Sequence, residues 1–66
     1  MTDKELLAWQ ELLKFCEEKG IEHFNKIIRF KELNFYYDGT ILTDFGNVIC
    51  YNRTPKQIKA IITNLL

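Results

Sequence analysis

The 66-residue sequence has little proline and glycine, with one and three residues respectively, so it lacks the composition of a disordered chain. Hydrophobic residues make up 47% and charged residues 27%, which is typical of a globular domain. No apolar run approaches the ~20 residues that a membrane-spanning helix needs. The N-terminal residues also lack the apolar stretch of a signal peptide. We therefore expect a cytoplasmic protein with a single domain over residues 1–66.

The sequence has no surplus of charge of either sign, because nine Lys and Arg residues balance nine Asp and Glu residues. This balance argues against a strongly basic nucleic-acid binder and against an acidic mimic of DNA. The charges are unevenly distributed, however. Residues 1–24 hold six acids and three bases, whereas residues 25–66 hold six bases and three acids. The second part therefore carries a local basic surplus.

Cysteine and histidine are also scarce, with two residues and one, and they lack the spacing of a zinc site. Cys16 and Cys50 each lie within an apolar pattern, so we interpret them as buried, reduced thiols. Neither cysteine is predicted to lie near His23, so a Cys–His catalytic pair is unsupported. No phosphate-binding loop, nucleophile elbow or dinucleotide fingerprint occurs. We therefore expect no cofactor, no metal, no small-molecule substrate and no enzymatic activity.

Residues 3–19 predict an amphipathic helix, with apolar side chains on one half of the helical wheel. Thr2 and Glu5 fit a capping box at its start. Gly20 supplies the left-handed residue that often ends a helix. Leu7 falls among the polar residues and is the one clear exception to the pattern.

The C-terminal part predicts a second helix that runs to the end of the chain. Thr54 can cap this helix, Pro55 suits its first position and Gln57 completes a capping box. Apolar residues then follow at helical spacing: Ile58, Ile61, Ile62, Leu65 and Leu66. They form one apolar stripe that faces a core.

Two glycine-containing pairs between the helices predict tight hairpins. Asp38-Gly39 is typical of a two-residue type I′ turn, and Gly46-Asn47 suits a type II′ turn. These turns predict a three-stranded antiparallel meander with strands at 33–37, 40–45 and 48–52. Two amphipathic helices need one apolar surface to cover, and this sheet provides it. The predicted fold is therefore a small two-layer α+β domain of helix, meander and helix.

Residues 22–32 are ambiguous, because their short apolar runs fit either a helix or a strand. We favour a connection through Asn25 and an extended segment from about Lys26. The apolar alternation changes phase near Lys31-Glu32, which predicts a bulge or a strand break.

The predicted turns also set which side chains share a face of the sheet. One face carries Leu33, Phe35, Tyr37, Leu42, Ile49 and Tyr51, and we expect the helices to cover it. The other face holds apolar side chains between polar ones, which is unusual for a solvated face. Its candidate partner-binding residues, joined by one exposed apolar residue of the first helix, are Tyr36, Ile41, Phe45, Val48 and Leu7. The alternatives are that residues 22–32 cover this face or that it belongs to the core.

The short chain can bury only a small core, so a partner is a plausible source of stability. We predict a non-catalytic protein-interaction module that binds itself as a homodimer or binds a larger protein. Its Lys, Ile, Asn and Phe content fits an AT-rich bacterial genome or its phages, where such a chain could modulate a host protein. The alternative is a weak single-stranded nucleic-acid-binding accessory protein, because basic residues interleave with aromatic ones. That alternative would use Arg29, Lys31, Arg53, Lys56 and Lys59.

Overall fold

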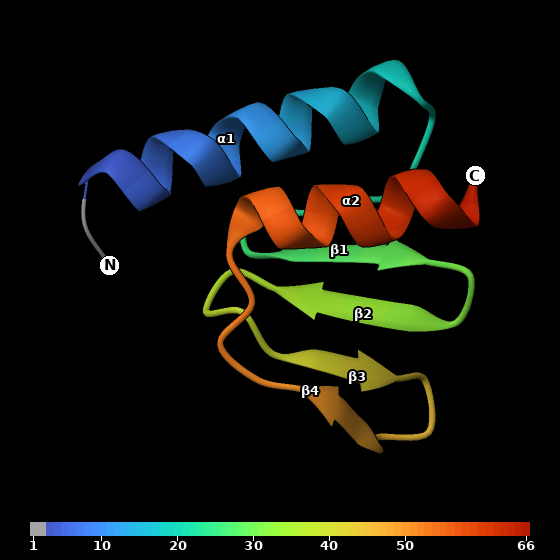
Figure 1. The fold of residues 1–66 in the computed structure, drawn as a ribbon. Helices are drawn as coiled ribbons and strands as arrows, with labels where there is room; N and C mark the ends of the chain where they lie inside the picture. The colour runs from blue at the N-terminus through green and yellow to red at the C-terminus, as the bar shows by residue number, and fades with distance from the viewer. Residues whose placement is uncertain (1–2) are drawn as a thin grey trace.

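The computed structural model describes residues 3–66 as a helix, four strands and a second helix (Figure 1). The elements are α1 (Asp3–Glu18), β1 (Ile27–Phe30), β2 (Leu33–Tyr36), β3 (Ile41–Thr43), β4 (Val48–Cys50) and α2 (Pro55–Leu65). The strands form one antiparallel sheet in the order β1-β2-β3-β4. The predicted small α+β class is confirmed, but the sheet has four strands instead of three.

Helix α1 ends next to Gly20, as the sequence predicts. Gly20 has a φ of +70°, and the backbone N–H of Ile21 donates to the carbonyl of Cys16 at 2.8 Å. The chain thus folds back onto the last helical turn and buries Ile21 in the core. The capping box predicted for the other end of α1 includes Thr2, which lies outside the described residues.

Helix α2 begins with the predicted capping box. The Thr54 hydroxyl accepts from the Gln57 N–H at 3.2 Å, and the Gln57 side chain accepts from the Thr54 N–H at 2.9 Å. Pro55 occupies the first turn, where its missing N–H has no partner to lose. This cap fixes the start of the helix and so directs Ile58 and Ile62 into the core.

The strand that the predicted meander lacks is β1, and it corresponds to the extended segment expected from about Lys26. A two-residue turn at Lys31 and Glu32 joins it to β2, and these residues have φ values of +48° and +66°. The predicted bulge or break is therefore a hairpin turn whose two central residues both adopt the left-handed conformation. Such a turn usually contains glycine or asparagine, and this one contains neither.

The two glycine hairpins have three-residue loops instead of the expected two-residue loops. The N–H groups of Gly39 and Gly46 each donate to the carbonyl three positions earlier, and both glycines have positive φ values. This is the common hairpin loop in which a type I turn precedes a left-handed glycine. The extra loop residue shifts the register by one, so Phe35 pairs with Ile41 and not with Leu42.

Because of this register shift, the side chains on the covered face of the sheet differ from those expected. A row of side chains crosses all four strands through the register pairs of Ile28, Phe35, Ile41 and Cys50. Ile41, expected on the open face, is only 2% exposed. Conversely, three residues expected in the core are exposed: Tyr37, Ile49 and Tyr51.

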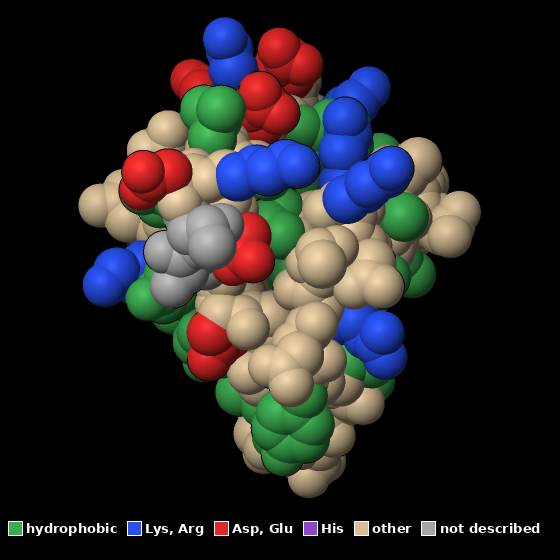
Figure 2. Space-filling view, turned by 60° about the vertical axis from the view of Figure 1, so that its left-hand side comes forward, with side chains coloured by type: hydrophobic (Ala, Val, Ile, Leu, Met, Phe, Trp, Pro, Cys, Tyr) green, Lys and Arg blue, Asp and Glu red, His purple; other side chains and the backbone are tan. Residues whose placement is uncertain are grey.

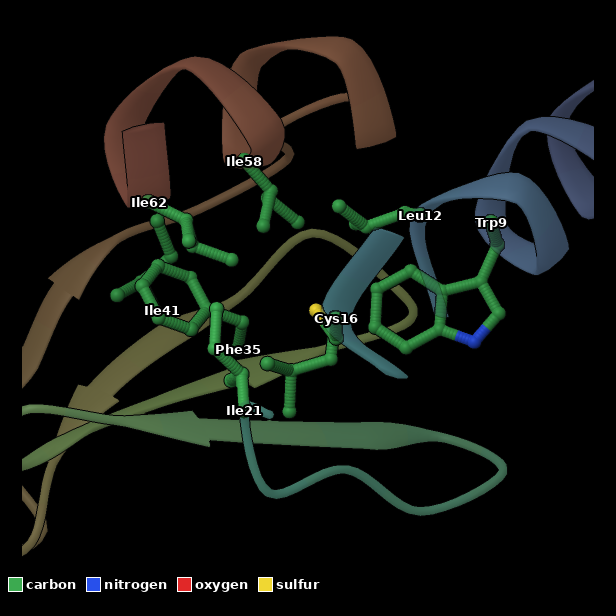
Figure 3. Close-up of a cluster of buried hydrophobic side chains, with 9 residues drawn as sticks. Trp9, Leu12, Cys16, Ile21, Phe35, Ile41, Ile58 and Ile62 are labelled. Atoms are coloured by element: carbon green, nitrogen blue, oxygen red, sulfur yellow. The ribbon is translucent and has the colours of Figure 1, made fainter. Parts of the chain in front are cut away.

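Both helices pack on this face of the sheet and form one core with it. Figure 3 shows the α2 side chains of Ile58 and Ile62 close to Phe35 and Ile41 of the sheet. Helix α1 contributes its buried side chains to the same cluster: Trp9, Leu12 and Cys16. The opposite face of the sheet is covered by neither helix, and we call it the outer face.

Candidate protein-interaction surface

Exposed apolar side chains gather in one short segment around β4. Phe45 is 88% exposed and Tyr51 is 65% exposed, and Val48 and Ile49 between them are also exposed. We call these four residues the β3–β4 tip. The other large exposed hydrophobic side chains are spread over the two helices and the loops: Leu6, Leu7, Phe24, Tyr37 and Leu66. No other stretch of seven residues within 3–66 holds as many exposed large hydrophobic side chains.

The geometry of the β3–β4 loop explains the exposure of Phe45. The loop closes because the Thr43 N–H donates to the Asn47 carbonyl at 2.9 Å and the Asn47 N–H donates to the Thr43 hydroxyl at 3.1 Å. Phe45 lies in the middle of this three-residue loop, followed by the left-handed Gly46. A strand position, as expected from the sequence, would have placed it on one face of the sheet. The observed loop holds it at the end of the hairpin, away from the core.

The tip contains no charged residue, since none occurs between Asp44 and Arg53. The Asp44 side chain points away from the tip and contacts β1 and β2. Its carboxylate accepts from the Asn34 side chain at 3.0 Å and forms a 3.5 Å ion pair with Arg29. In Figure 2 the charged side chains lie over the upper and middle parts of the molecule, and the lower end shows only apolar and neutral groups. Because Figure 2 is turned about the vertical axis of Figure 1, this lower end is the β3–β4 end of the sheet.

The two edges of the sheet differ in their backbone hydrogen bonds. The β1 edge is covered by the preceding segment: the Arg29 N–H donates to the Glu22 carbonyl at 2.9 Å, and the Phe24 N–H donates to the Ile27 carbonyl at 2.6 Å. Strand β4 pairs only with β3 among the described residues, so its outward edge is open. A register shift next to Ile41 and Leu42 makes β4 irregular, and the strand is three residues long.

The structure brings only part of the predicted partner-binding set together. Phe45 and Val48 lie in the tip, and Tyr36 is half-buried on the outer face. Ile41 is buried in the core and is not available to a partner, which corrects that prediction. Leu7 is exposed, but it lies on α1 and not beside the other candidates.

The sequence reasoning missed Ile49 and Tyr51, because it assigned both to the covered face. The signal that could have found them is the uncharged stretch 45–52, which is unusual for an edge strand. Natural edge strands often carry charged side chains that prevent pairing with other chains.

The basic residues of the nucleic-acid alternative are divided between two sides of the sheet. Arg29 lies on the outer face in its ion pair with Asp44, whereas Lys56 and Lys59 lie on α2, which covers the other face. Lys59 also lies over the Phe15 ring, with 5.0 Å between its ammonium and the ring centroid. Lys31 lies in the β1–β2 turn over its neighbour Phe30, and Arg53 lies in the loop before α2. Lys56 and Lys59 line one hollow on α2, but Arg29 lies on the other face of the sheet, so the five residues do not share one face.

The side chains that could act in catalysis differ in burial: Cys16 is buried, whereas His23 and Cys50 are partly exposed. Burial raises the pKa of the Cys16 thiol to about 11, so it is not a thiolate at neutral pH. The His23 ring nitrogen Nδ1 lies 2.9 Å from the Ile21 carbonyl, a backbone contact. Within residues 3–66, no three side chains of the metal-ligating types come together to hold an ion.

The described surface has several open hollows, with volumes from about 200 to about 660 Å³. One of about 660 Å³ is a broad depression lined by five consecutive residues, 23–27. A more polar hollow of about 200 Å³ lies between the β2–β3 loop and the start of α2, next to Asp38 and Arg53. Small-molecule sites are usually enclosed clefts of roughly 300–1,000 Å³. The hollows of that size on the described surface, including one of about 340 Å³ beside Leu6, Trp9 and Leu13, are open and not enclosed.

No described helix is both long and apolar enough to cross a membrane. Comparisons with protein-family models, with curated proteins and with solved structures find no match to this chain.

Proposed function

We propose that this chain is a small, non-catalytic protein-interaction module and that the β3–β4 tip is its contact surface. The observation that carries the proposal is the clustering of Phe45, Val48, Ile49 and Tyr51 in one uncharged segment. Contiguous exposed apolar patches on small proteins often mark interaction sites. Aromatic side chains also contribute strongly to the binding energy of protein interfaces.

The partner that fits this surface first is a second copy of the chain. A fully exposed aromatic side chain presents ~200 Å², so Phe45 and Tyr51 together expose roughly 300 Å². A standard interface buries ~800 Å² on each partner. The tip with its flanks therefore fits a small interface, and we expect a dissociation constant of roughly 10 µM to 1 mM.

The test is the solution mass of the protein by light scattering between about 10 µM and 1 mM. We expect the mass to rise from the monomer value of 7.9 kDa towards twice that value. Phe45→Asp should remain monomeric with an unchanged far-ultraviolet circular dichroism spectrum, because Phe45 makes little contact with the core. Leu7→Asp is the matched control, since Leu7 is also exposed but lies on α1, and it should dimerise as the wild type does.

Two results would overturn the proposal. One is a wild-type protein that stays monomeric up to 1 mM. The other is binding of single-stranded DNA or RNA at ~50 mM salt that Phe45→Asp leaves intact, because electrostatic binding is strongest at low salt. That second result would support the nucleic-acid alternative, because Phe45 is not one of the five basic residues that it would use.

A further inference from the structure

We infer that two copies associate through their β4 strands, which pair antiparallel and join the two sheets into one. This inference rests on the proposed self-association and names its mode. An open strand edge offers unpaired N–H and C=O groups to another strand, and those groups determine how two chains can align. Within the described residues, the β4 edge is the edge that remains open.

The asymmetry between the two edges limits the assembly to a dimer. On the β1 side, residues 22–24 already bond the carbonyl of Ile27 and the N–H of Arg29. A copy that joins through β4 therefore presents a covered β1 edge at its far side. Two identical strands related by a two-fold axis run antiparallel, and that arrangement closes at two copies. An open edge on both sides would instead permit continued addition of copies.

The side chains of β4 also favour pairing with themselves. Like charges that lie directly opposite one another destabilise a strand pair. Because residues 45–52 carry no charge, no antiparallel alignment of two copies within this stretch brings like charges together. Val48, Ile49 and Tyr51 are β-branched or aromatic, and such residues stabilise strand pairs through cross-strand contacts. The short length and irregular register of β4 limit the number of new hydrogen bonds, in agreement with a weak dimer.

Amide hydrogen exchange followed by nuclear magnetic resonance distinguishes edge pairing from other contacts. At 1 mM, where a dissociation constant of ~100 µM leaves about a fifth of the chains monomeric, we expect some amides of residues 47–51 to exchange about fivefold more slowly than in the dilute monomer. The amides of β1 should not change, because that edge is already bonded. If the mass doubles while the exchange of residues 47–51 stays the same, the pairing mode is wrong and the proposed function stands. If the mass never rises, the self-association itself fails.

A matched pair of lysine variants provides the second readout. Ile49 is 53% exposed at the open edge, and Phe24 is 54% exposed beside the covered edge. We expect Ile49→Lys to raise the dissociation constant at least tenfold, because a lysine at an edge opposes strand addition and both copies carry it. Phe24→Lys should dimerise like the wild type. Equal effects of the two substitutions, or an effect of Phe24→Lys alone, would overturn the β4 assignment.

Discussion

At the scale of single residues, Gly39 lies at a position that only glycine fits. Its φ is +94°, and a Cβ atom there would lie 2.5 Å from the backbone N and O of Arg53. The Arg53 N–H also donates to the Gly39 carbonyl at 2.9 Å, so the β2–β3 loop and the start of α2 are held together. We expect Gly39→Ala to lower the free energy of unfolding by about 3 kcal/mol, measured by urea denaturation.

Gly46 is the matched control for this substitution. Its φ of +88° is similar, but a Cβ atom at this position meets nothing within 4 Å. We expect Gly46→Ala to cost only about 1 kcal/mol, from the backbone conformation alone. A loss of equal size in the two variants would show that the contact with Arg53 does not limit position 39.

The buried Cys16 thiol gives a second prediction at this scale. Its pKa is raised to about 11 by burial, from an ordinary value of 9.0. The unfolded chain therefore loses this proton at a lower pH than the folded chain does. Its contribution to stability is present below pH 9 and is lost as the pH rises towards 11. We expect this alkaline loss in the free energy of unfolding to disappear in Cys16→Ala, measured by urea denaturation at several pH values.

The two thiols should also differ in their rate of alkylation. Cys16 is fully buried, whereas Cys50 is partly exposed on β4. With iodoacetamide at pH 8, we expect Cys50 to be modified at least tenfold faster, as followed by mass spectrometry of the peptides. Equal rates at the two positions would contradict the burial of Cys16.

At the scale of elements, the start of α2 shows how completely a local signal can specify a structure. Thr54, Pro55 and Gln57 act within one helical turn, so the capping box follows from the sequence alone. We expect Thr54→Ala to lower the midpoint of thermal unfolding, with a cost of about 1 kcal/mol. Thr63→Ala, at another exposed position of α2, should be neutral or stabilising, because alanine has the higher helix propensity and the lost bond from the Thr63 hydroxyl to the Lys59 carbonyl is exposed. A larger loss from Thr63→Ala than from Thr54→Ala would contradict this account of the cap.

The hairpins show where local signals are insufficient. Gly39 and Gly46 correctly predict two turns, but a glycine does not state whether a loop has two or three residues. One additional loop residue changes which side chains reach the core. Because two-residue loops were expected, Ile41 was predicted on the open face, although it lies in the core. The β1–β2 turn carries no glycine at all. The Asp44 N–H donates to the Glu32 carbonyl at 3.0 Å, so the β3–β4 loop supports this turn through a contact remote in sequence.

The candidate surface could likewise be predicted only in part from the sequence. The sequence indicates an excess of apolar side chains on the sheet, and Phe45 and Val48 belong to it. The inclusion of Ile49 and Tyr51 depends on the register of β4, which the loop length sets. The open edge depends on residues 22–24 pairing with β1, a contact that no local pattern encodes.

At the scale of the whole molecule, the proposed dimer links association to stability. A chain of 66 residues buries a small core, so its stability is marginal and a partner adds a measurable share. If the dissociation constant is ~100 µM, a rise in concentration from 10 µM to 1 mM adds roughly 1 kcal/mol to the folded state. For a domain of this size, that corresponds to an increase of about 5 °C in the midpoint of thermal unfolding.

We expect this concentration dependence in the wild type and in Leu7→Asp, measured by circular dichroism in cells of different path length. Phe45→Asp should have one midpoint at all concentrations, close to that of the dilute wild type, because Phe45 is exposed and belongs to the proposed contact surface. A midpoint that is lower in Phe45→Asp even at 10 µM would place Phe45 in the fold of the monomer. A wild-type midpoint that does not change with concentration would contradict the dimer, because association that stabilises the folded chain must raise the midpoint by mass action.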